Sequence, residues 1–598
     1  MLLLKKFVLK YFTHFSYFYL QLRYRIFVAL GLSILVGLMD GFGLAMFIPM
    51  LEMVGDGTAS AEGLGNLAFL VKGLTILGLE LSLVTVLLTM LFFFSLKGIA
   101  KFVEQYYKVI VQQYFISKLR LDNVDKLTHF QYKAFVTSDA GRIQNTLSGE
   151  TERVANAYRF YMSTMQSAIM LTVYVLLAFL ANPQFALLIA VGGVLSNFLF
   201  QQLYKRTKAV SKKITLDAHG YQGLLIQKVA FFKYLKATAL NSVFSDKLKT
   251  AIRSIEDNNK KIGYYNAILE ATREPLTIAV VVAVILVQVK VFGSGLGLII
   301  LSLLFFFRAL TYLMHVQTMW NNFLNVSGSL ENMTGFQKEI SKQQERYGKQ
   351  PLERFREGIQ LRGLDFRYGN KIILQDIDLA LEAKKTYAFV GESGSGKTTL
   401  VNLIAGLMPP EKGQILIDGQ DIRDLDIRTY QSRIGYITQE PVIFNDTVFN
   451  NVTFWAVPSS TNRKRFWEAL DKAAIADFVR SLEGQEGAVL GNNGINLSGG
   501  QRQRLSIARE LYKEIDILVM DEATSALDSE TEKAIQDNID QLKGQYTILI
   551  VAHRLSTIRN ADEVVLMSQG RIEEKGSFEK LIHHSGNFKK MVELQEIL

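Results

Sequence analysis

Residues Gly391–Thr399 have the sequence GESGSGKTT, in which glycine, lysine and hydroxyl residues have the spacing of a phosphate-binding loop. Glycines let successive backbone N–H groups turn towards one anion without a Cβ in the way. A β-branched and aromatic run, Thr386–Val390, precedes the loop, and an apolar helical pattern, Leu400–Leu407, follows it. The helix would add the positive end of its dipole. We therefore expect Lys397 to reach the outer phosphates of a nucleotide and the Thr398 hydroxyl to bind Mg²⁺. The residues expected around the phosphates are Gly391, Glu392, Ser393, Gly394, Ser395, Gly396, Lys397, Thr398 and Thr399.

Two apolar strands further along the chain end in residues that could act on the same nucleotide. Ile515–Met520 ends at Asp521-Glu522, and Tyr546–Ala552 ends at His553-Arg554. Ligands gather at the carboxyl ends of parallel strands, so these groups would meet the phosphate loop. Asp521 could hold Mg²⁺, and Glu522 could polarise an attacking water. The alternatives are a solvated strand end for the acidic pair and a structural role for the histidine.

A second glycine pair follows Leu497 in the sequence LSGGQ, directly before a helix that we expect to begin near Gln501. A serine at this place is commonly a helix N-cap. The two glycines also leave the backbone open to an anion. Ser498, Gly499, Gly500 and Gln501 therefore form a second candidate phosphate-binding element.

The composition points to a membrane protein with more than one domain. The chain has 598 residues, of which 49% are hydrophobic and 20% are charged, so the two kinds must be segregated. It has no cysteine, which excludes disulfides, cysteine-ligated zinc and a cysteine nucleophile. The last two of the six predicted spans are shorter than the ~20 residues that a bilayer requires, so they must extend into their flanks. The spans are Ile26–Val54, Leu81–Leu96, Phe160–Leu180, Phe185–Phe200, Leu276–Val289 and Gly295–Phe307.

Among the loops between the spans, basic residues lie almost entirely in the long segments after the second and fourth spans, whereas the opposite loops carry only Lys72 and Lys290. By the positive-inside rule, the N-terminus, both long segments and everything after the sixth span are cytoplasmic. This asymmetry accounts for the net charge of +10 without nucleic acid as a partner. Both long segments have few Gly or Pro and are expected to be helices that project from the bilayer. Leu64–Leu79 is expected to be a short external helix.

These patterns predict a multidomain membrane protein, with an all-α six-helix transmembrane domain and an α/β P-loop NTPase domain. Ile415–Ile417 followed by Asp418-Gly419 indicates a hairpin in the second domain. Charged residues inside spans usually face a bundle interior or cavity, and Arg308 and Asp40 are therefore candidate substrate residues. A buried contact between helices is the alternative for Asp40. The predicted parts are an interfacial helix at 1–25, the six-span domain at 26–328, a linker at 329–358 and the α/β domain at 359–598.

In their order and spacing, GESGSGKTT, LSGGQ, ILVMDEATSALD and VAHRLST resemble the nucleotide-binding domain of ABC transporters. The resemblance runs from Ile359 to about Leu594, and the six spans are similar to those of exporter-type members. It implies that Tyr368 stacks on adenine and that Gln439 contacts Mg²⁺ and the membrane domain. The regions that contain and follow the coupling helices would be Phe135–Glu150 and Leu224–Lys236. Exporters commonly carry an acidic residue where this chain has Asn492. The chain therefore departs from the family pattern at the point where the coupling helices would communicate with the LSGGQ motif.

The resemblance also implies a mechanism. Two such domains would enclose two ATP molecules with Mg²⁺, each between the phosphate loop of one copy and Ser498–Gly500 of the other. Ser525–Asp528 would cross to the partner, Glu522 would be the general base of an ATP hydrolase, and His553 would contact the γ-phosphate. The partner would be a second copy of the chain or a related half-transporter. The intact motifs favour a homodimer.

The sequence says less about the identity of the cargo than about ATP hydrolysis. The first half is loosely similar to bacterial flippases of lipid-linked oligosaccharides, through FIPMLEMV, the external helix and Arg308 in FFFRALTYLM. Arg308 would bind an anionic head group, so we expect a lipid-like or hydrophobic cargo and contact with membrane lipids in a bacterial inner membrane. Lipid A-type glycolipids, peptides and drugs stay open as alternatives, and so does an ATP-gated channel. The six spans argue against a soluble ATPase of DNA repair or translation.

Overall fold

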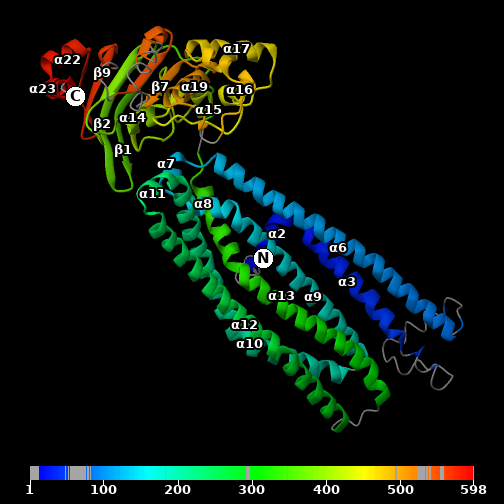
Figure 1. The fold of residues 1–598 in the computed structure, drawn as a ribbon. Helices are drawn as coiled ribbons and strands as arrows, with labels where there is room; N and C mark the ends of the chain where they lie inside the picture. The colour runs from blue at the N-terminus through cyan, green and yellow to red at the C-terminus, as the bar shows by residue number, and fades with distance from the viewer. Residues whose placement is uncertain are drawn as a thin grey trace. The chain divides into compact units, whose positions relative to one another are not determined.

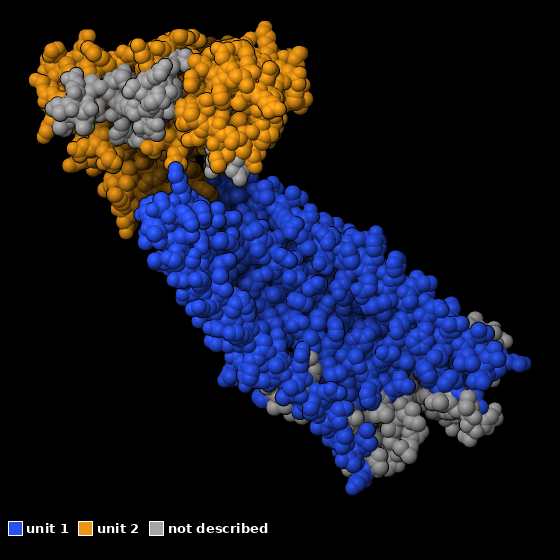
Figure 2. All heavy atoms as spheres, viewed as in Figure 1, with its two compact units in different colours: residues 1–130, 138–344 blue, residues 131–137, 345–598 orange. Residues whose placement is uncertain are grey.

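The computed structural model resolves two compact units, which Figure 2 colours separately. Residues 1–130 and 138–344 form the first unit, and residues 131–137 and 345–598 form the second. We call the first the helical unit and the second, after the domain expected from the sequence, the ATPase unit. The structure describes residues 13–47, 49–50, 53, 76, 80, 82–181, 183–290, 296–345, 348–491, 494–521, 533, 536–537, 540–552 and 558–596.

The helical unit contains long helices that are continuous from the predicted spans into the predicted cytoplasmic segments (Figure 1). Four of its helices have 46, 48, 50 and 47 residues, which corresponds to about 70 Å each. A bilayer core is about 30 Å thick, so less than half of each helix is needed to cross it. The helices are α2 (Thr13–Leu22), α3 (Tyr24–Ala45), α6 (Leu83–Thr128), α8 (Ala140–Leu147), α9 (Gly149–Ala181), α10 (Pro183–Ala230), α11 (Phe232–Ala237), α12 (Asn241–Lys290) and α13 (Leu296–Lys342).

Aromatic packing joins these helices at the start of the chain. Phe18 of α2 is fully buried, and its ring centroid lies 5.7 Å from that of Phe115 on α6. Phe115 stacks at 5.0 Å on Tyr158 of α9, and Tyr161 lies 5.3 Å from Phe323 of α13. Segments far apart in the sequence therefore share one core.

Within the described residues, α3, α6 and α9 are long and apolar enough to cross a membrane. The apolar part of α6 is mostly uncovered by the rest of the unit, with Leu88, Leu91 and Phe92 exposed. Such a surface would be unfavourable in water and suits contact with lipid. Residues 1–12 of the predicted interfacial helix, and Leu64–Leu79 except for Ile76, lie outside the described residues.

The ATPase unit is built on two sheets, as an α/β domain requires. The six-stranded sheet has the order β10-β9-β3-β8-β7-β6, with β10 antiparallel to β9 and the other pairs parallel. The second sheet is antiparallel, in the order β2-β1-β4-β5. The strands are β1 (Gly358–Tyr368), β2 (Lys371–Glu382), β3 (Thr386–Val390), β4 (Lys412–Ile417), β5 (Gln420–Asp421), β6 (Ile434–Ile437), β7 (Ile517–Asp521), β8 (Thr547–Val551), β9 (Glu563–Ser568) and β10 (Arg571–Gly576).

Helices of the ATPase unit cover the sheets, and two of them, α14 and α19, begin in the predicted phosphate-binding motifs. The predicted hairpin is confirmed: Ile417 pairs with Gln420 across Asp418-Gly419, whose φ angles of 47° and 78° suit a tight turn. The helices are α7 (Tyr132–Thr137), α14 (Lys397–Ile404), α15 (Ile427–Gln431), α16 (Val448–Thr453), α17 (Ser460–Lys472), α18 (Ala476–Ser481), α19 (Gly499–Tyr512), α22 (Phe578–His584) and α23 (Gly586–Glu596).

The predicted fold class, a helical domain joined to an α/β ATPase-type domain, is confirmed. The boundary differs in one detail. The predicted linker at 329–358 begins inside α13, which continues to Lys342, and the ATPase unit resumes at residue 345. Charged and Gln-rich composition was the signal for a linker, but these residues also have good helix propensity and prolong the helix.

Candidate functional site

The predicted strand, loop and helix around Gly391 are present. All five residues of β3 are buried, and α14 begins at Lys397. Gly391, Gly394 and Gly396 have φ angles of 144°, 82° and 102°. A Cβ at Gly391 would lie 2.0 Å from the Met567 carbonyl oxygen, so this position requires glycine for space as well as for its backbone.

Hydrogen bonds hold the side chains of two loop residues, Lys397 and Thr398. The Lys397 side chain is buried, and its Nζ donates to the carbonyl oxygens of Gly391 (2.8 Å) and Glu392 (3.0 Å). The Thr398 hydroxyl donates to Asp521 Oδ1 at 3.3 Å. This contact joins two motifs that are 123 residues apart in the sequence. A hydroxyl and a carboxylate side by side are the oxygen ligands that Mg²⁺ prefers, so the residues fit the expected metal.

Sheet register brings the ends of β7 and β8, the strands that precede Glu522 and His553 in the sequence, to the same edge. Asp521 at the end of β7 pairs with Val551 of β8, and Val551 pairs in turn with Phe389 of β3. Glu522 follows β7 directly, and His553 comes two residues after β8. Both residues lie outside the described part of the chain, so their roles stay predictions.

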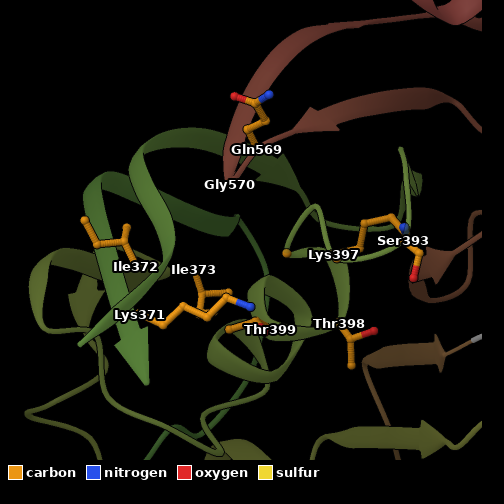
Figure 3. A pocket seen from close by; sticks show the side chains of 11 residues that line it. Lys371, Ile372, Ile373, Ser393, Lys397, Thr398, Thr399, Gln569 and Gly570 are labelled. Atoms are coloured by element: carbon orange, nitrogen blue, oxygen red, sulfur yellow. The ribbon is translucent and has the colours of Figure 1, made fainter. Parts of the chain in front are cut away.

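A pocket of about 430 Å³ opens beside the phosphate loop (Figure 3). Sequence reasoning identified one wall of it, formed by Ser393, Gly394 and the residues 396–399. It missed the other wall, because no motif contains these positions. The only signal was that Lys371–Ile373 follow Tyr368 closely in the sequence, and Gln569 and Gly570 had none. The missed residues are Lys371, Ile372, Ile373, Gln569 and Gly570.

Tyr368, the expected adenine partner, does not line this pocket in the structure. Its ring is edge-on to Phe366, with centroids 5.1 Å apart, and its hydroxyl donates to Met408 Sδ at 3.1 Å. Burial raises the pKa of the Tyr368 hydroxyl, so the group is a proton donor at neutral pH. The side chain would have to leave this contact to stack on a base.

The LSGGQ segment forms the start of α19. Ser498 Oγ accepts from the Gln501 backbone N–H at 3.2 Å, and Gln501 Oε1 accepts from the Ser498 N–H at 2.8 Å. This capping box places the helix start at Gly499, two residues before the predicted point. Ser498 and Gly499 are exposed, whereas Gly500 is buried. None of these four described residues lines the pocket beside the phosphate loop.

Three further predicted positions complete the ATPase unit. Gln439 is exposed and follows β6 by two residues, on a loop. Asn492 and Ser525–Asp528 lie outside the described residues. Their assigned roles therefore stay predictions.

A short helix from the first half of the chain, α7, packs within the ATPase unit. Lys133 Nζ lies 3.0 Å from Glu411 Oε1 and 4.8 Å from the centre of the Phe366 ring. Arg367 Nε binds the same carboxylate at 2.9 Å, and Tyr132 packs against the buried core. The sequence predicts this coupling region at Phe135–Glu150, whereas the contacting helix begins three residues earlier.

In the helical unit, Asp40 is a buried contact between helices. Its carboxylate accepts from Lys97 Nζ at 2.5 Å and from the Tyr174 hydroxyl. The Tyr174 ring stacks on that of Tyr312, with centroids 5.4 Å apart. Tyr312 follows Arg308 by one helical turn on α13, and the Arg308 side chain is exposed within this chain. Asp40 thus joins α3, α6 and α9 by polar contacts, and the Tyr174–Tyr312 stack joins α9 to α13, where Arg308 lies one turn before Tyr312.

Three lysines of α6 were missed as site residues because the sequence suggested only loop charge. Lys97, Lys101 and Lys108, with Glu104 between them, lie on one helix face by their spacing of four, three and four. Glu104 is buried and binds Lys101 at 2.5 Å and the Ser33 hydroxyl at 2.6 Å. Lys108 Nζ donates to Ser163 Oγ at 2.9 Å and Gln166 Oε1 at 3.2 Å, both on α9. We call Lys97, Lys101, Lys108 and Arg308 the cationic band.

Comparison with known proteins gives a consistent result in both halves. The family model described as ABC transporter matches residues 374–525, and the model described as ABC transporter transmembrane region matches residues 26–314. A protein of Cupriavidus metallidurans named ATP-dependent lipid A-core flippase is 30% identical over 511 residues, which cover 83% of this chain and 85% of that protein.

Two further proteins resemble this chain over different shares of its length. A protein of the same name from Syntrophus aciditrophicus is 44% identical over 244 residues, which cover 41% of this chain and 40% of the relative. The solved structure of a bacterial Atm1-family ABC exporter with ATP bound has a TM-score of 0.77 and covers 96% of this chain and 98% of its own. Its sequence identity is 24%, so it shows a shared fold.

Proposed function

The chain belongs to the ABC transporter family, and from this we propose that it is an ATP-driven flippase for an anionic lipid. Its ATPase domain hydrolyses ATP, and its membrane region moves the lipid from the cytoplasmic side. The likeness to proteins named as lipid A-core flippases supports a phosphorylated glycolipid as the cargo.

The observation that carries the choice of cargo is the cationic band inside the helical unit. Lys97 directly follows the predicted span Leu81–Leu96, and Arg308 directly follows the predicted span Gly295–Phe307. A cation beside the bilayer core is costly to bury and is usually kept for function. Asp40 and Glu104 hold Lys97 and Lys101, but the side chains of these lysines are still 27% and 48% exposed. Exposed ammonium and guanidinium groups in such a place favour phosphate over a neutral cargo.

The ATPase unit supplies the motor. Lys397 and the amides of residues 391–399 hold the phosphates, and Thr398 with Asp521 holds Mg²⁺, which neutralises charge that develops during transfer to water. Glu522 positions that water, and His553 contacts the γ-phosphate. Gln439 completes the site from the loop after β6.

The working unit is a dimer, either of two copies or with a related half-transporter. The support is that Ser498–Gln501 do not line the pocket of their own chain, so a second copy can bring this helix start to the nucleotide. In a bacterial inner membrane, each copy crosses six times, with its N-terminus and ATPase unit in the cytoplasm.

A substrate comparison in lipid nanodiscs tests this proposal. ATPase activity is measured with lipid A, a lipid-linked oligosaccharide, a zwitterionic phospholipid and a hydrophobic drug, side by side. We expect stimulation by the two anionic lipids, lipid A and the lipid-linked oligosaccharide, and none by the zwitterionic phospholipid or the drug. Stimulation by the drug alone would reject the lipid cargo and favour a multidrug exporter.

A further inference from the structure

The wall of the nucleotide pocket that faces the phosphate loop comes from two strand turns. Lys371, Ile372 and Ile373 belong to the start of β2, and Gln569 and Gly570 form the turn between β9 and β10. No motif that identifies the family includes these residues. In Figure 3 they surround the pocket on the side opposite Ser393 and Lys397.

Backbone bonds fix this wall to the loop. The Gly570 N–H donates to the Ser395 carbonyl at 3.2 Å, and the Gly570 carbonyl accepts from the Gln375 N–H at 2.9 Å. A Cβ at Gly570 would lie 2.4 Å from the Ile373 carbonyl oxygen, so the turn and β2 are in close contact. The wall is therefore positioned before any ligand arrives.

The backbone of Lys371 is held in place by strand pairing, whereas its side chain is exposed. Its Cα pairs with that of Tyr368 across the two-residue turn Gly369-Asn370, which holds the start of β2 in place. The residue is exposed, and Figure 3 shows its side chain directed into the pocket. Among the described lining residues, the other lysine is Lys397, whose ammonium is buried and bonded to two carbonyl oxygens of the loop.

Charge explains what such a group can do. A nucleoside triphosphate carries several negative charges, and charge-assisted bonds from an ammonium to phosphate are about twice as strong as neutral ones. The neighbouring Ile372 is 57% exposed and offers apolar surface to the nucleoside end of the same ligand.

We propose that Lys371 is a nucleotide-binding residue, whose ammonium binds a phosphate oxygen of ATP from the side opposite the phosphate loop. The inference rests on the ATPase part of the proposed function and is independent of the cargo. Lys371 contributes to affinity; it takes no part in activating water.

The test is steady-state ATPase kinetics of the full-length protein with Lys371→Ala, Lys371→Arg and the control Lys464→Ala. Lys464 lies on α17 and its side chain is 80% exposed. We expect Lys371→Ala to raise KM for ATP about tenfold at unchanged kcat, which corresponds to one charge-assisted contact of about 1.4 kcal/mol. Lys371→Arg should stay within about twofold of the parent, as should Lys464→Ala.

Competition with ADP and AMP locates the contact. A loss of affinity for ATP and ADP alike assigns it to the inner phosphates, and a loss for ATP alone assigns it to the γ-phosphate. An unchanged KM in Lys371→Ala, or a fall in kcat alone, overturns the proposal. If the parent protein itself lacks ATPase activity, the proposed function fails instead, so the two failures are distinguishable.

Discussion

The two units use buried charge differently. In the ATPase unit, the predicted phosphate loop occupies nine consecutive residues, and the buried Lys397 is bonded to carbonyl oxygens of that same loop. In the helical unit, the cationic band draws on α6 and α13, and its partners come from α3 and α9. The phosphate loop is thus local in sequence, whereas the candidate cargo site exists only after the helices pack.

The phosphate loop is a feature that the whole family shares, whereas the cargo site is a feature of the individual member. A phosphate loop needs a fixed backbone, so glycines at a fixed spacing reveal it. A lipid head group is bound by side chains that come together only where helices pack, and many different sequences can place a cation at such a position. The predictions below test the contrast, from the largest expected effect to the smallest.

Glu522→Gln should reduce ATP hydrolysis by at least about 100-fold, because the amide cannot accept a proton from the attacking water. Binding of ATP should be retained, since the loop and Thr398 are untouched. Phosphate release and nucleotide binding are measured on the same preparation. Glu514→Gln is the control, because Glu514 lies before β7 with its side chain 81% exposed. Near-normal turnover in Glu522→Gln would overturn the general-base assignment.

Arg509→Ala should lower the free energy of unfolding of the ATPase unit by about 3–5 kcal/mol, because it removes three buried hydrogen bonds from one charged group. The Arg509 side chain is buried and donates to the Asn451 carbonyl (2.6 Å), the Val442 carbonyl (2.7 Å) and Asn451 Oδ1 (3.0 Å). Burial also lowers the pKa of the guanidinium. Thermal unfolding is the measurement. Arg465→Ala, with a side chain that is 39% exposed, serves as the control, and equal shifts for the two variants would contradict the account.

Asp40→Asn should destabilise the helical unit by about 2–4 kcal/mol, because it leaves the Lys97 ammonium without its carboxylate. The double variant Asp40→Asn/Lys97→Met removes both charges and should recover most of the thermal stability. If the double variant regains stability but not transport, Lys97 acts on the cargo. If Asp40→Asn is as stable as the parent and loses transport only, Asp40 itself is a cargo residue.

Arg308→Ala should reduce lipid-stimulated ATPase activity about fivefold to tenfold and leave basal activity within about twofold, as loss of one charge-assisted contact predicts. The exposed guanidinium makes a folding defect an unexpected outcome. Lys290→Ala, at the end of α12, is the matched control. Equal loss of basal and stimulated activity would point to a structural role for Arg308.

Lys133→Glu should have the smallest effect on stability, below about 1 kcal/mol, because its ion pair with Glu411 is about one-third exposed on both sides. It should weaken the stimulation of ATPase activity by lipid, since α7 joins the first half of the chain to the ATPase unit. The charge-swapped variant Lys133→Glu/Glu411→Lys should restore stimulation. Failure of the swap, with normal stability, would contradict a role for this ion pair.

The sequence predicted the ATPase unit in most of its detail. The strand Thr386–Val390 has the predicted bounds, and the hairpin at Asp418-Gly419 and the Ser498 cap follow from local backbone chemistry. The opposite wall of the pocket could not be predicted, because Lys371 and Gly570 meet the loop only through sheet packing. The contact between Tyr368 and Met408 is likewise a tertiary one.

In the helical unit, the sequence predicted the helices and their extension beyond the spans, but not their packing partners. The sequence suggested that the lysines at positions 97, 101 and 108 were loop charges. In the structure, the predicted span and its cytoplasmic extension form one unbroken helix, α6, so these lysines lie on a helix face. Pairing of Asp40 with Lys97 joins residues 57 positions apart and has no local signal. The polar face of α6 becomes meaningful only when α3 and α9 are packed against it.

ATP-dependent movement of a phosphorylated glycolipid across the membrane of sealed proteoliposomes tests the central claim most directly. Labelled lipid A is supplied in both leaflets, and the fraction that is accessible from outside is followed after addition of Mg²⁺-ATP, with Glu522→Gln as the control. The account predicts a change in the leaflet distribution with the parent protein and none with Glu522→Gln or without ATP. Steady ATP hydrolysis with an unchanged leaflet distribution would contradict it.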